Sequence, residues 1–143
     1  ARLRNGTLSH LAIEAAGLRF DPALVLAGNF TEHSGLVAVE RLLDSRTRFS
    51  AILAANDQMA FGAALSLYRR GRRVPDDVSL VGFDDLAGSL YMVPPLTTVH
   101  NPIQEIGQLA ARAMLGLLAG ERPAIEVPAP RLIVRESTRA VTA

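Results

Sequence analysis

The chain has 143 residues, of which 49% are hydrophobic and 20% charged, a composition typical of one globular domain with a core. Its formal net charge of +1 gives no electrostatic case for nucleic acid binding. All fifteen basic residues are Arg, which excludes a lysine nucleophile, a Schiff base and a phosphate-loop lysine, and the absence of Cys excludes disulfides and thiolate metal sites. No apolar run reaches transmembrane length and no signal peptide is visible, so we expect a cytoplasmic protein without membrane contact.

The first third of the chain predicts a helix, a strand and a second helix. Apolar residues recur at helical spacing over residues 8–16. Residues 24–27 are a short apolar run that predicts a strand, and Phe30 lies just past its end. The second helix is expected to begin at Thr31 or Ser34, since either can cap it. The opening helix has no strand before it, which suggests that the first strand of the sheet is missing from this chain.

The centre of the chain predicts a strand, a helix and a second strand. Residues 51–55 are a short apolar run, and Asn56 or Asp57 can accept a hydrogen bond from the first turn of the following helix. Gly71 ends that helix, and residues 78–83 have the composition of a buried strand. Two strands joined by one helix pair in parallel. This alternation predicts an α/β fold of three layers, in which helices cover both faces of a mostly parallel sheet.

Polar residues follow both strands of this central unit. Asn56 and Asp57 come after the first strand, Asp84 and Asp85 come after the second, and Phe30 ends a neighbouring strand. The carboxyl ends of parallel strands form one edge, where open α/β sheets bind ligands. Carboxylates, an amide and an aromatic face suit a hydroxyl-rich molecule such as a sugar. A purely structural role stays open for each residue: a helix cap for Asn56 or Asp57, a turn for Asp84 and core packing for Phe30.

The last third of the chain predicts one long helix between extended segments. Residues 96–99 are expected to be extended and residues 102–119 to form the helix. Two strands are expected at residues 125–127 and 131–134, and the polar tail from Glu136 is expected to fray. Asn101 is expected to cap the helix, because Pro follows at the first helical position and Gln stands three residues after the cap. The helix carries a broad apolar stripe.

Motifs of enzymatic or metal chemistry are missing from the sequence. His10, His33 and His100 share no metal-ligand spacing, so we expect no metal site. There is no nucleophile elbow and no Gly-rich dinucleotide or phosphate loop. Acidic pairs at strand ends also occur in phospho-acceptor receiver domains, but that chemistry would want a lysine at another strand end. We therefore expect no enzymatic activity and no cofactor.

Four successive motifs resemble the LacI/GalR family of bacterial transcription regulators. They are AANDQMAFGA, GRRVPDDVSLVGFDD, PPLTTVHNP and PRLIVREST, all between residues 54 and 138. An earlier segment, GNFTEHSGLVAVERLL, resembles the same family more weakly. The resemblance implies a sensor domain with the periplasmic-binding-protein fold, in which a small molecule binds between two α/β lobes joined by crossing strands.

The same resemblance implies how the chain divides. Residues 1–95 resemble the C-terminal lobe without its first strand, and residues 96–123 resemble a crossing strand and a helix of the N-terminal lobe. Residues 124–138 resemble the return to the C-terminal lobe, and residues 139–143 are a tail. We expect the helix-turn-helix DNA-binding head, its hinge helix and most of the N-terminal lobe to be absent from this chain. The long helix then lacks its cover, so its apolar stripe should seek a partner chain or fold back.

The resemblance also implies which residues meet the effector. Asn56 and Asp84 match positions that usually hydrogen-bond the effector in this family. Phe30 matches an aromatic residue that stacks on the effector, and Asn101 matches a position on the crossing strand that reaches it. The same comparison implies that the effector is a small molecule such as a sugar or a nucleobase.

Three further positions follow from the resemblance. Arg4 matches the effector-binding arginine of the family, although the local pattern departs there and Arg2 could be the match instead. Tyr91 and Phe61 resemble residues of the dimer contact region, and Phe61 could equally belong to the core. We therefore expect a homodimer that reaches operator DNA only through the missing head.

The leading interpretation is the effector-binding and dimerisation domain of a LacI-type transcriptional regulator, expected to be a repressor that senses a sugar. The alternative is the extracytoplasmic sugar-binding protein of an ABC transporter, which has the same fold. The crossing at residues 96–99 and the RLIVREST ending favour the regulator. An enzyme is the third class, and no motif supports it.

Overall fold

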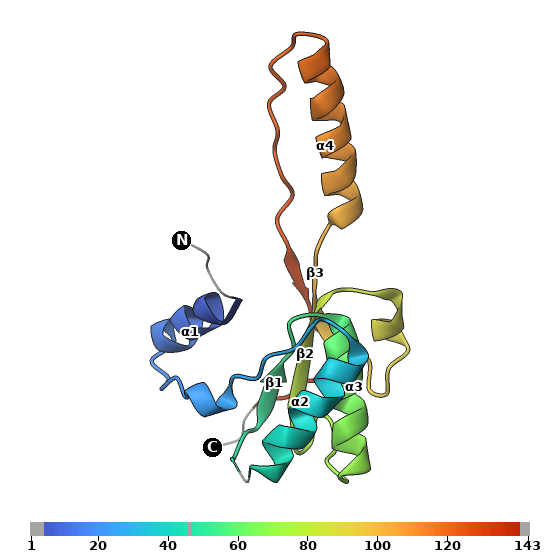
Figure 1. Cartoon of the computed structure of the whole chain (residues 1–143). Coiled ribbons are helices and arrows are strands. Elements are labelled where there is room, and N and C mark those ends of the chain that lie inside the picture. Colours follow the sequence, from blue (N-terminus) through green and yellow to red (C-terminus); the bar gives the residue numbers. More distant parts are fainter. Residues whose placement is uncertain (1–4, 46, 141–143) are drawn as a thin grey trace.

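The computed structural model describes residues 5–45 and 47–140. In chain order their elements are α1 (Asn5–Ala15), η1 (Pro22–Leu24), α2 (Glu32–Asp44), β1 (Ala51–Leu53), α3 (Asp57–Arg69), β2 (Ser79–Asp84), η2 (Ala87–Leu90), β3 (Thr97–His100), α4 (Ile103–Leu118) and β4 (Arg131–Ile133). The elements η1 and η2 are short 3-10 helices. The sheet with α2, α3 and η2 forms the body of the molecule, and α4 projects from it (Figure 1).

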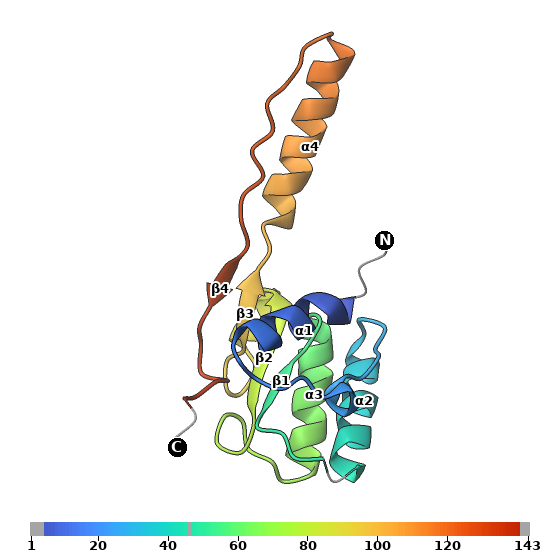
Figure 2. The same cartoon turned by 90° about the vertical axis from the view of Figure 1, so that its left-hand side faces the viewer.

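The four strands of the described residues form one sheet in the order β1, β2, β3, β4. β1 and β3 both pair with β2 in parallel, and β4 pairs with β3 in the antiparallel sense. The predicted strand–helix–strand unit is confirmed as β1, α3 and β2. Because α2 and α3 lie on one side of the sheet and α1 on the other, the predicted α/β fold is confirmed as well (Figures 1 and 2).

The core of the body lies between α3 and the sheet. Leu67 of α3 and Leu80 of β2 are completely buried there, and removing such apolar side chains from water is the main source of stability. α2 packs closely against α3 at Gly35 and Gly62. A Cβ on Gly62 would lie 1.8 Å from the carbonyl oxygen of Glu32, so a larger residue would push the two helices apart.

Two of the predicted strands are wrong. Residues 24–27 form no strand, because Asp21 accepts a hydrogen bond from the N–H of Ala23 at 2.9 Å and so caps η1, which takes up the first residue of the run. The remaining residues have only the edge of β1 to pair with, and β1 is three residues long. Residues 125–127 form no strand either, since three prolines surround them and proline has no N–H for a ladder.

α4 and the segment that returns from it, residues 119–130, form an arm that projects from the body (Figures 1 and 2). Five large apolar side chains of α4 are between 58% and 81% exposed: Ile103, Met114, Leu115, Leu117 and Leu118. The apolar stripe of this helix therefore stays largely uncovered. None of the described helices is both long and apolar enough to cross a bilayer.

The polar stretch after β4 is buried, and it does not fray over the described residues. The hydroxyl of Ser137 accepts a hydrogen bond from the N–H of Thr97 at 2.7 Å and donates to the carbonyl oxygen of Leu80 at 2.6 Å. Ser137 is 0% exposed. The prediction of a fraying tail from Glu136 is wrong, because the polar groups of this stretch find buried partners on β2 and β3.

Candidate functional site

Asn56 and Phe30 lie together at the edge formed by the carboxyl ends of the strands. The Oδ1 of Asn56 accepts a hydrogen bond from the N–H of Met59 at 2.9 Å, and its Nδ2 donates to the carbonyl oxygen of Phe30 at 3.0 Å. Asn56 is 7% exposed, and its predicted role as the cap of α3 is confirmed. An Asn amide has two N–H groups and two lone pairs, so one of each remains for a further partner.

Backbone strain is concentrated at this same edge. Among the described residues, the non-glycine residues with positive φ are Phe30 at 67°, Asp84 at 108° and Asp85 at 58°. Each such residue costs on the order of 1–3 kcal/mol, and strain of this kind clusters at binding sites. Phe30 is 51% exposed, so the core-packing alternative for Phe30 is wrong. The turn presents the ring to solvent instead.

Asp84 ends β2, beside the strand that precedes Asn56. Burial raises the pKa of its carboxyl above the ordinary value of 3.8, and the negative charge of Asp57 raises it further. A hydrogen bond from Asn101 acts in the opposite direction. A half-buried carboxylate beside another carboxylate gains from any additional hydroxyl or N–H donor. Asp84 is therefore placed to accept a further hydrogen bond.

Asn101 does not cap α4, so that prediction is wrong. The N-cap position is Pro102, and no side-chain cap bond is formed there. The helix begins at Ile103, one residue later than predicted, so Pro102 takes the cap position and Asn101 stands before it. Asn101 directly follows His100, which is the register partner of Asp84, so Asn101 lies close to Asp84. The structure thus joins two of the predicted site residues, one from β2 and one from the end of β3.

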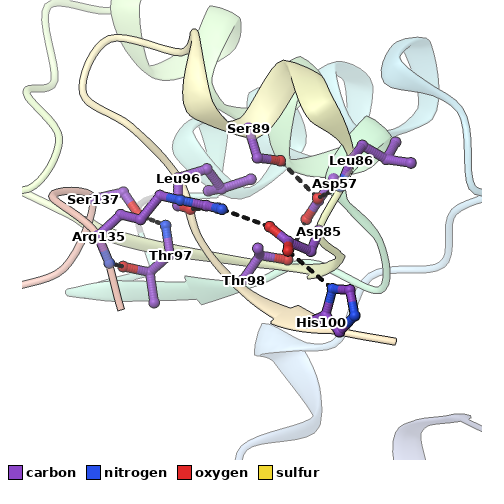
Figure 3. A network of polar contacts seen from close by, with 10 residues as sticks. All are labelled: Asp57, Asp85, Leu86, Ser89, Leu96, Thr97, Thr98, His100, Arg135 and Ser137. Atoms are coloured by element: carbon purple, nitrogen blue, oxygen red, sulfur yellow. Dashed lines mark hydrogen bonds and ion pairs between the residues drawn. The ribbon is translucent and has the colours of Figure 1, made fainter. Parts of the chain in front are cut away.

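Asp57, which follows the cap of α3, is completely buried and accepts three hydrogen bonds. Its Oδ2 accepts from the N–H of Leu86 at 2.8 Å and from the hydroxyl of Ser89 at 2.6 Å, and its Oδ1 accepts from the hydroxyl of Thr98 (Figure 3). β2 passes close beside this carboxylate at Gly82, where a Cβ would lie 2.1 Å from Oδ1. One carboxylate therefore joins α3, the η2 loop and β3 behind the candidate site.

Asp85 ties together the two strands that lead to and from the arm. Its carboxylate lies 2.6 Å from the Nη2 of Arg135, after β4, and 3.0 Å from the Nδ1 of His100, at the end of β3 (Figure 3). Arg135 also donates to the carbonyl oxygen of Leu96 at 2.8 Å. Burial opposes ionisation of Asp85, but the hydrogen bonds and charges of Arg135 and His100 outweigh it and hold the pKa below 3.8.

Sequence reasoning did not single out Ser89, Thr98 or Arg135. Their partners lie 32 to 50 residues away along the chain, so no local pattern connects them. The available signal is that Thr98 is a polar residue inside an extended segment expected to be buried, where a hydroxyl needs a partner. That signal predicts a buried partner without identifying it.

The remaining predicted residues lie away from this edge or outside the described part of the chain. Arg4 falls outside the described residues. Phe61 is half-buried and packs on the core, and a Cβ on Gly88 of η2 would lie 3.1 Å from its ring. Tyr91 directly follows η2 and is 82% exposed. The structure therefore brings both predicted dimer residues to the neighbourhood of η2.

The candidate site is an edge of the sheet and not one of the cavities found in the body. A cavity of about 370 Å³ lies near the amino ends of β1 and β2, beside Phe49 and Val78, and one of about 270 Å³ lies beside α2. None of the predicted effector residues lines either cavity. Over residues 5–45 and 47–140, no group of three or more His, Asp or Glu residues is placed to hold a metal ion.

Comparison with known proteins agrees with the fold and with the motifs. The periplasmic binding protein-like domain family matches residues 1–138. The HTH-type transcriptional regulator CelR of Thermobifida fusca is 40% identical over 128 residues, which cover 88% of this chain and 38% of CelR. The crystal structure of the Escherichia coli transcriptional repressor AscG has a TM-score of 0.85 at 36% identity, over 92% of this chain and 48% of that chain.

A complex of the regulator CelR with cellobiose is also similar, with a TM-score of 0.83 at 38% identity over 90% of this chain and 40% of that chain. The chain thus spans less than half the length of these relatives. The motifs between residues 54 and 138 lie inside the matched range. The chain belongs to the periplasmic binding protein-like domain family, in common with the sensing domain of LacI-type transcriptional regulators.

Proposed function

We propose that this chain is the effector-sensing domain of a cytoplasmic LacI-type transcriptional repressor, and that a sugar binds at the carboxyl-end edge of its sheet. The observation that carries the proposal is the placement of Asp84 and Asn101 at the ends of adjacent parallel strands, at the edge where Asn56 holds the half-exposed Phe30 by a hydrogen bond. The relatives are transcription regulators and one was solved with cellobiose, which favours this function over the transporter alternative.

Each residue of the site has a distinct role toward a sugar. Asp84 accepts hydrogen bonds from hydroxyls, and Asn101 both donates and accepts. The exposed ring of Phe30 stacks on the apolar face of the sugar. Asn56 contributes the N–H and lone pair that its structural bonds leave over. Arg4, outside the described residues, adds a fork of donors in this proposal.

The sheet edge acts in this proposal as one wall of a cleft between two lobes. Residues 1–95 and 124–138 form the C-terminal lobe, and residues 96–123 pass toward the other lobe. An effector that contacts both walls favours one arrangement of the lobes and so changes the operator affinity of the paired DNA-binding heads. Such couplings are typically about 1–3 kcal/mol and act equally in both directions.

A homodimer is proposed to form around η2. Tyr91 and Val93 are 82% and 93% exposed there, Leu90 is 55% exposed, and Phe61 supports the loop from beneath. Exposed aromatic and aliphatic residues that cluster in this way are typical of the buried centre of a protein–protein interface. The buried carboxylate of Asp57 holds this loop to β3, which connects the proposed dimer surface to the proposed site.

Calorimetric titration of the full-length protein with cellobiose, ribose and a purine base tests the proposal. For the sugar that binds, Asp84→Asn should weaken the affinity about 10- to 100-fold, since a hydrogen bond to a charged group contributes about 1.5–3 kcal/mol. Phe30→Ala should weaken it as well. Tyr68→Ala is the matched control, because Tyr68 is 80% exposed on α3 away from the edge.

The isolated 143-residue chain should bind the same sugar more weakly than the full-length protein, and it should not retard operator DNA at physiological salt. Both results follow if one wall of the cleft and the DNA-binding head lie in other parts of the protein. Unchanged affinity in Asp84→Asn, or an equal loss in Tyr68→Ala, would contradict the proposed site. Specific retardation of DNA by this chain would contradict the proposal that DNA binding belongs to a separate head.

A further inference from the structure

Two consecutive aspartates at the end of β2 have positive φ, 108° at Asp84 and 58° at Asp85. The value at Asp85 is close to the left-handed minimum at about +57°, which Asp tolerates better than most residues. Asp84 lies well outside that minimum, so its backbone is the more strained of the two. Backbone strain of this kind persists only where surrounding contacts hold it in place. The turn that carries Asp84 therefore needs an anchor.

The turn is anchored on two sides. The carboxylate of Asp85 lies 2.6 Å from the Nη2 of Arg135 and 3.0 Å from the Nδ1 of His100 (Figure 3). One residue further on, the N–H of Leu86 donates to the buried carboxylate of Asp57 at 2.8 Å. These contacts come from β3, from α3 and from the segment after β4, so they fix the turn against three separate parts of the body.

Arg135 is itself firmly held. Its Nη1 donates to the carbonyl oxygen of Leu96 at 2.8 Å, and its own N–H donates to the Oγ1 of Thr97 at 3.0 Å. Its side chain is 13% exposed, so solvent weakens the ion pair with Asp85 less than it would on the surface. Both oxygens of Asp85 have protein partners. The pair is thus engaged within the protein, and its effect on a ligand would pass through the turn that it holds.

We propose that Arg135 is a positioning residue of the effector site: through Asp85 it holds the turn in the conformation that orients the carboxylate of Asp84. This inference rests on the proposed function, in which Asp84 accepts hydrogen bonds from the effector. Without the ion pair, the strained φ of Asp84 relaxes toward the common negative values and its side chain changes direction. A group already held in its binding conformation needs no ordering when the ligand arrives. Arg135 thus raises the affinity for an effector that it does not contact.

Calorimetric titration of the full-length protein with cellobiose, ribose and a purine base measures this effect. For the ligand that binds, Arg135→Ala should weaken the affinity about tenfold, which is the size of one well-placed hydrogen bond to a charged group. Arg135→Lys keeps the charge without the fork of donors and should recover part of the loss. Arg70→Ala is the matched control, because Arg70 forms an ion pair of the same length, 2.6 Å, with the exposed Asp44. It should change the affinity by less than about twofold.

A double-mutant cycle separates positioning from a general loss of structure. Asp84→Gly removes the carboxylate and takes a positive φ without strain, so Arg135 has nothing left to orient. In that background, Arg135→Ala should weaken binding no further. In the Phe30→Ala background it should weaken binding by the same factor as in the wild type, because the backbone of Phe30 is held by Asn56. A general loss of structure would lower the affinity equally in both backgrounds.

An NMR measurement on the isolated chain needs no effector. The three-bond coupling between the amide proton and the Hα of residue 84 depends on φ. It should therefore change in Arg135→Ala and stay the same in Arg70→Ala. If Arg135→Ala does not fold, Asp85→Asn replaces it in both experiments, since it removes the charge that holds Arg135 and keeps the shape of the side chain.

The outcomes distinguish this inference from the proposed function. Unchanged affinity in Asp84→Gly would refute the proposed site, whatever the NMR coupling shows. If Asp84→Gly does weaken binding, the site stands, and the positioning role is overturned by an unchanged coupling in Arg135→Ala. It is also overturned if Arg135→Ala costs as much affinity in the Asp84→Gly background as in the wild type, or if Arg70→Ala costs as much as Arg135→Ala.

Discussion

The body and the arm of this chain place their polar and apolar side chains in opposite ways. In the body, Asp57, Thr98 and Ser137 are completely buried, and each has hydrogen-bond partners from distant segments. On the arm, Ile103 and Leu118 are 58% and 81% exposed. Buried polar groups fix which segments of the body lie together, because a wrong neighbour would leave them unsatisfied. No side-chain hydrogen bond of this kind is found within the arm, residues 103–130, and most of its large apolar side chains stay exposed.

Replacing Asp57 with Ala should lower the stability of the chain more than any other change, because it removes the central acceptor of the buried polar groups in the body. The change leaves the N–H of Leu86 and the hydroxyls of Ser89 and Thr98 without their acceptor. Because buried unsatisfied groups cost about 1–3 kcal/mol each, we expect the free energy of unfolding to fall by about 3–4 kcal/mol. Urea denaturation followed by circular dichroism measures it. Asp76→Ala, at a side chain 54% exposed, is the control, and a similar loss there would refute the argument.

Arg135→Ala should have the next largest effect, and its effect should depend on pH. Arg135 pairs with Asp85 and binds the carbonyl oxygen of Leu96, so its removal should cost about 2 kcal/mol at neutral pH. The pKa of Asp85 is lowered in the folded chain. Its ionised form therefore stabilises the fold above the unfolded value of 3.8, and this contribution is lost as the pH falls through the lower folded pKa.

The measurement is the free energy of unfolding of the wild type and of Arg135→Ala at pH 7 and near pH 3. The gap between the two proteins should narrow at the acidic pH. Arg135→Lys keeps the charge but not the fork of donors, so it should restore only part of the loss. A gap that is as wide at pH 3 as at pH 7 would show that the ion pair with Asp85 contributes little.

Asp84→Asn should stabilise the chain at neutral pH while it weakens effector binding. Burial and the charge of Asp57 raise the pKa of Asp84, so its ionised form costs stability above the folded pKa. We expect a gain of about 1 kcal/mol, the usual size of stabilising changes at functional sites. The gain should shrink as the pH falls toward 3.8, because the wild-type carboxyl is then protonated. Thermal melts at pH 7 and pH 4 test the sign, and destabilisation at pH 7 would mean that Asp84 holds the fold.

Met114→Gln should have the smallest effect on stability. It tests whether an exposed apolar residue of the arm contributes less to stability than a buried polar residue of the body. Met114 is 65% exposed on α4, and exposed substitutions usually change stability by less than about 0.5 kcal/mol. Urea denaturation should be carried out at a protein concentration below that of any self-association, since association would add to the apparent stability. A loss above about 1 kcal/mol would show that the arm packs on the body.

Local patterns were sufficient to predict the central unit of the body. The apolar run of β1, the cap at Asn56 and the helical spacing in α3 all depend on neighbours a few residues apart, and the structure contains each of them. The parallel pairing of β1 with β2 followed from the helix between them. The edge that carries Asn56 and Asp84 was therefore predictable from sequence, since topology places it.

The parts that escaped prediction depend on distant partners or on competition between local signals. Nothing near Asp57 in the sequence indicates Ser89 or Thr98 as its donors. Residues 24–27 have the composition of a strand, but Asp21 caps η1 and Leu24 becomes part of that 3-10 helix. The other three residues have only the short strand β1 beside them to pair with. At Asn101, the predicted start of α4 was one residue too early, because Pro102 takes the cap position and the helix begins at Ile103.

The position of Ser137 has a consequence for synthesis on the ribosome. Its hydroxyl bridges Leu80 and Thr97, which are translated 57 and 40 residues earlier. Helix α4 is synthesised before this bridge can form. The nascent chain therefore exposes the apolar side chains of α4 while the segment after β4 is not yet bound to β2 and β3. The sheet can therefore close only after residue 137 has been translated, and chaperones that hold exposed apolar segments can act in the interval before that.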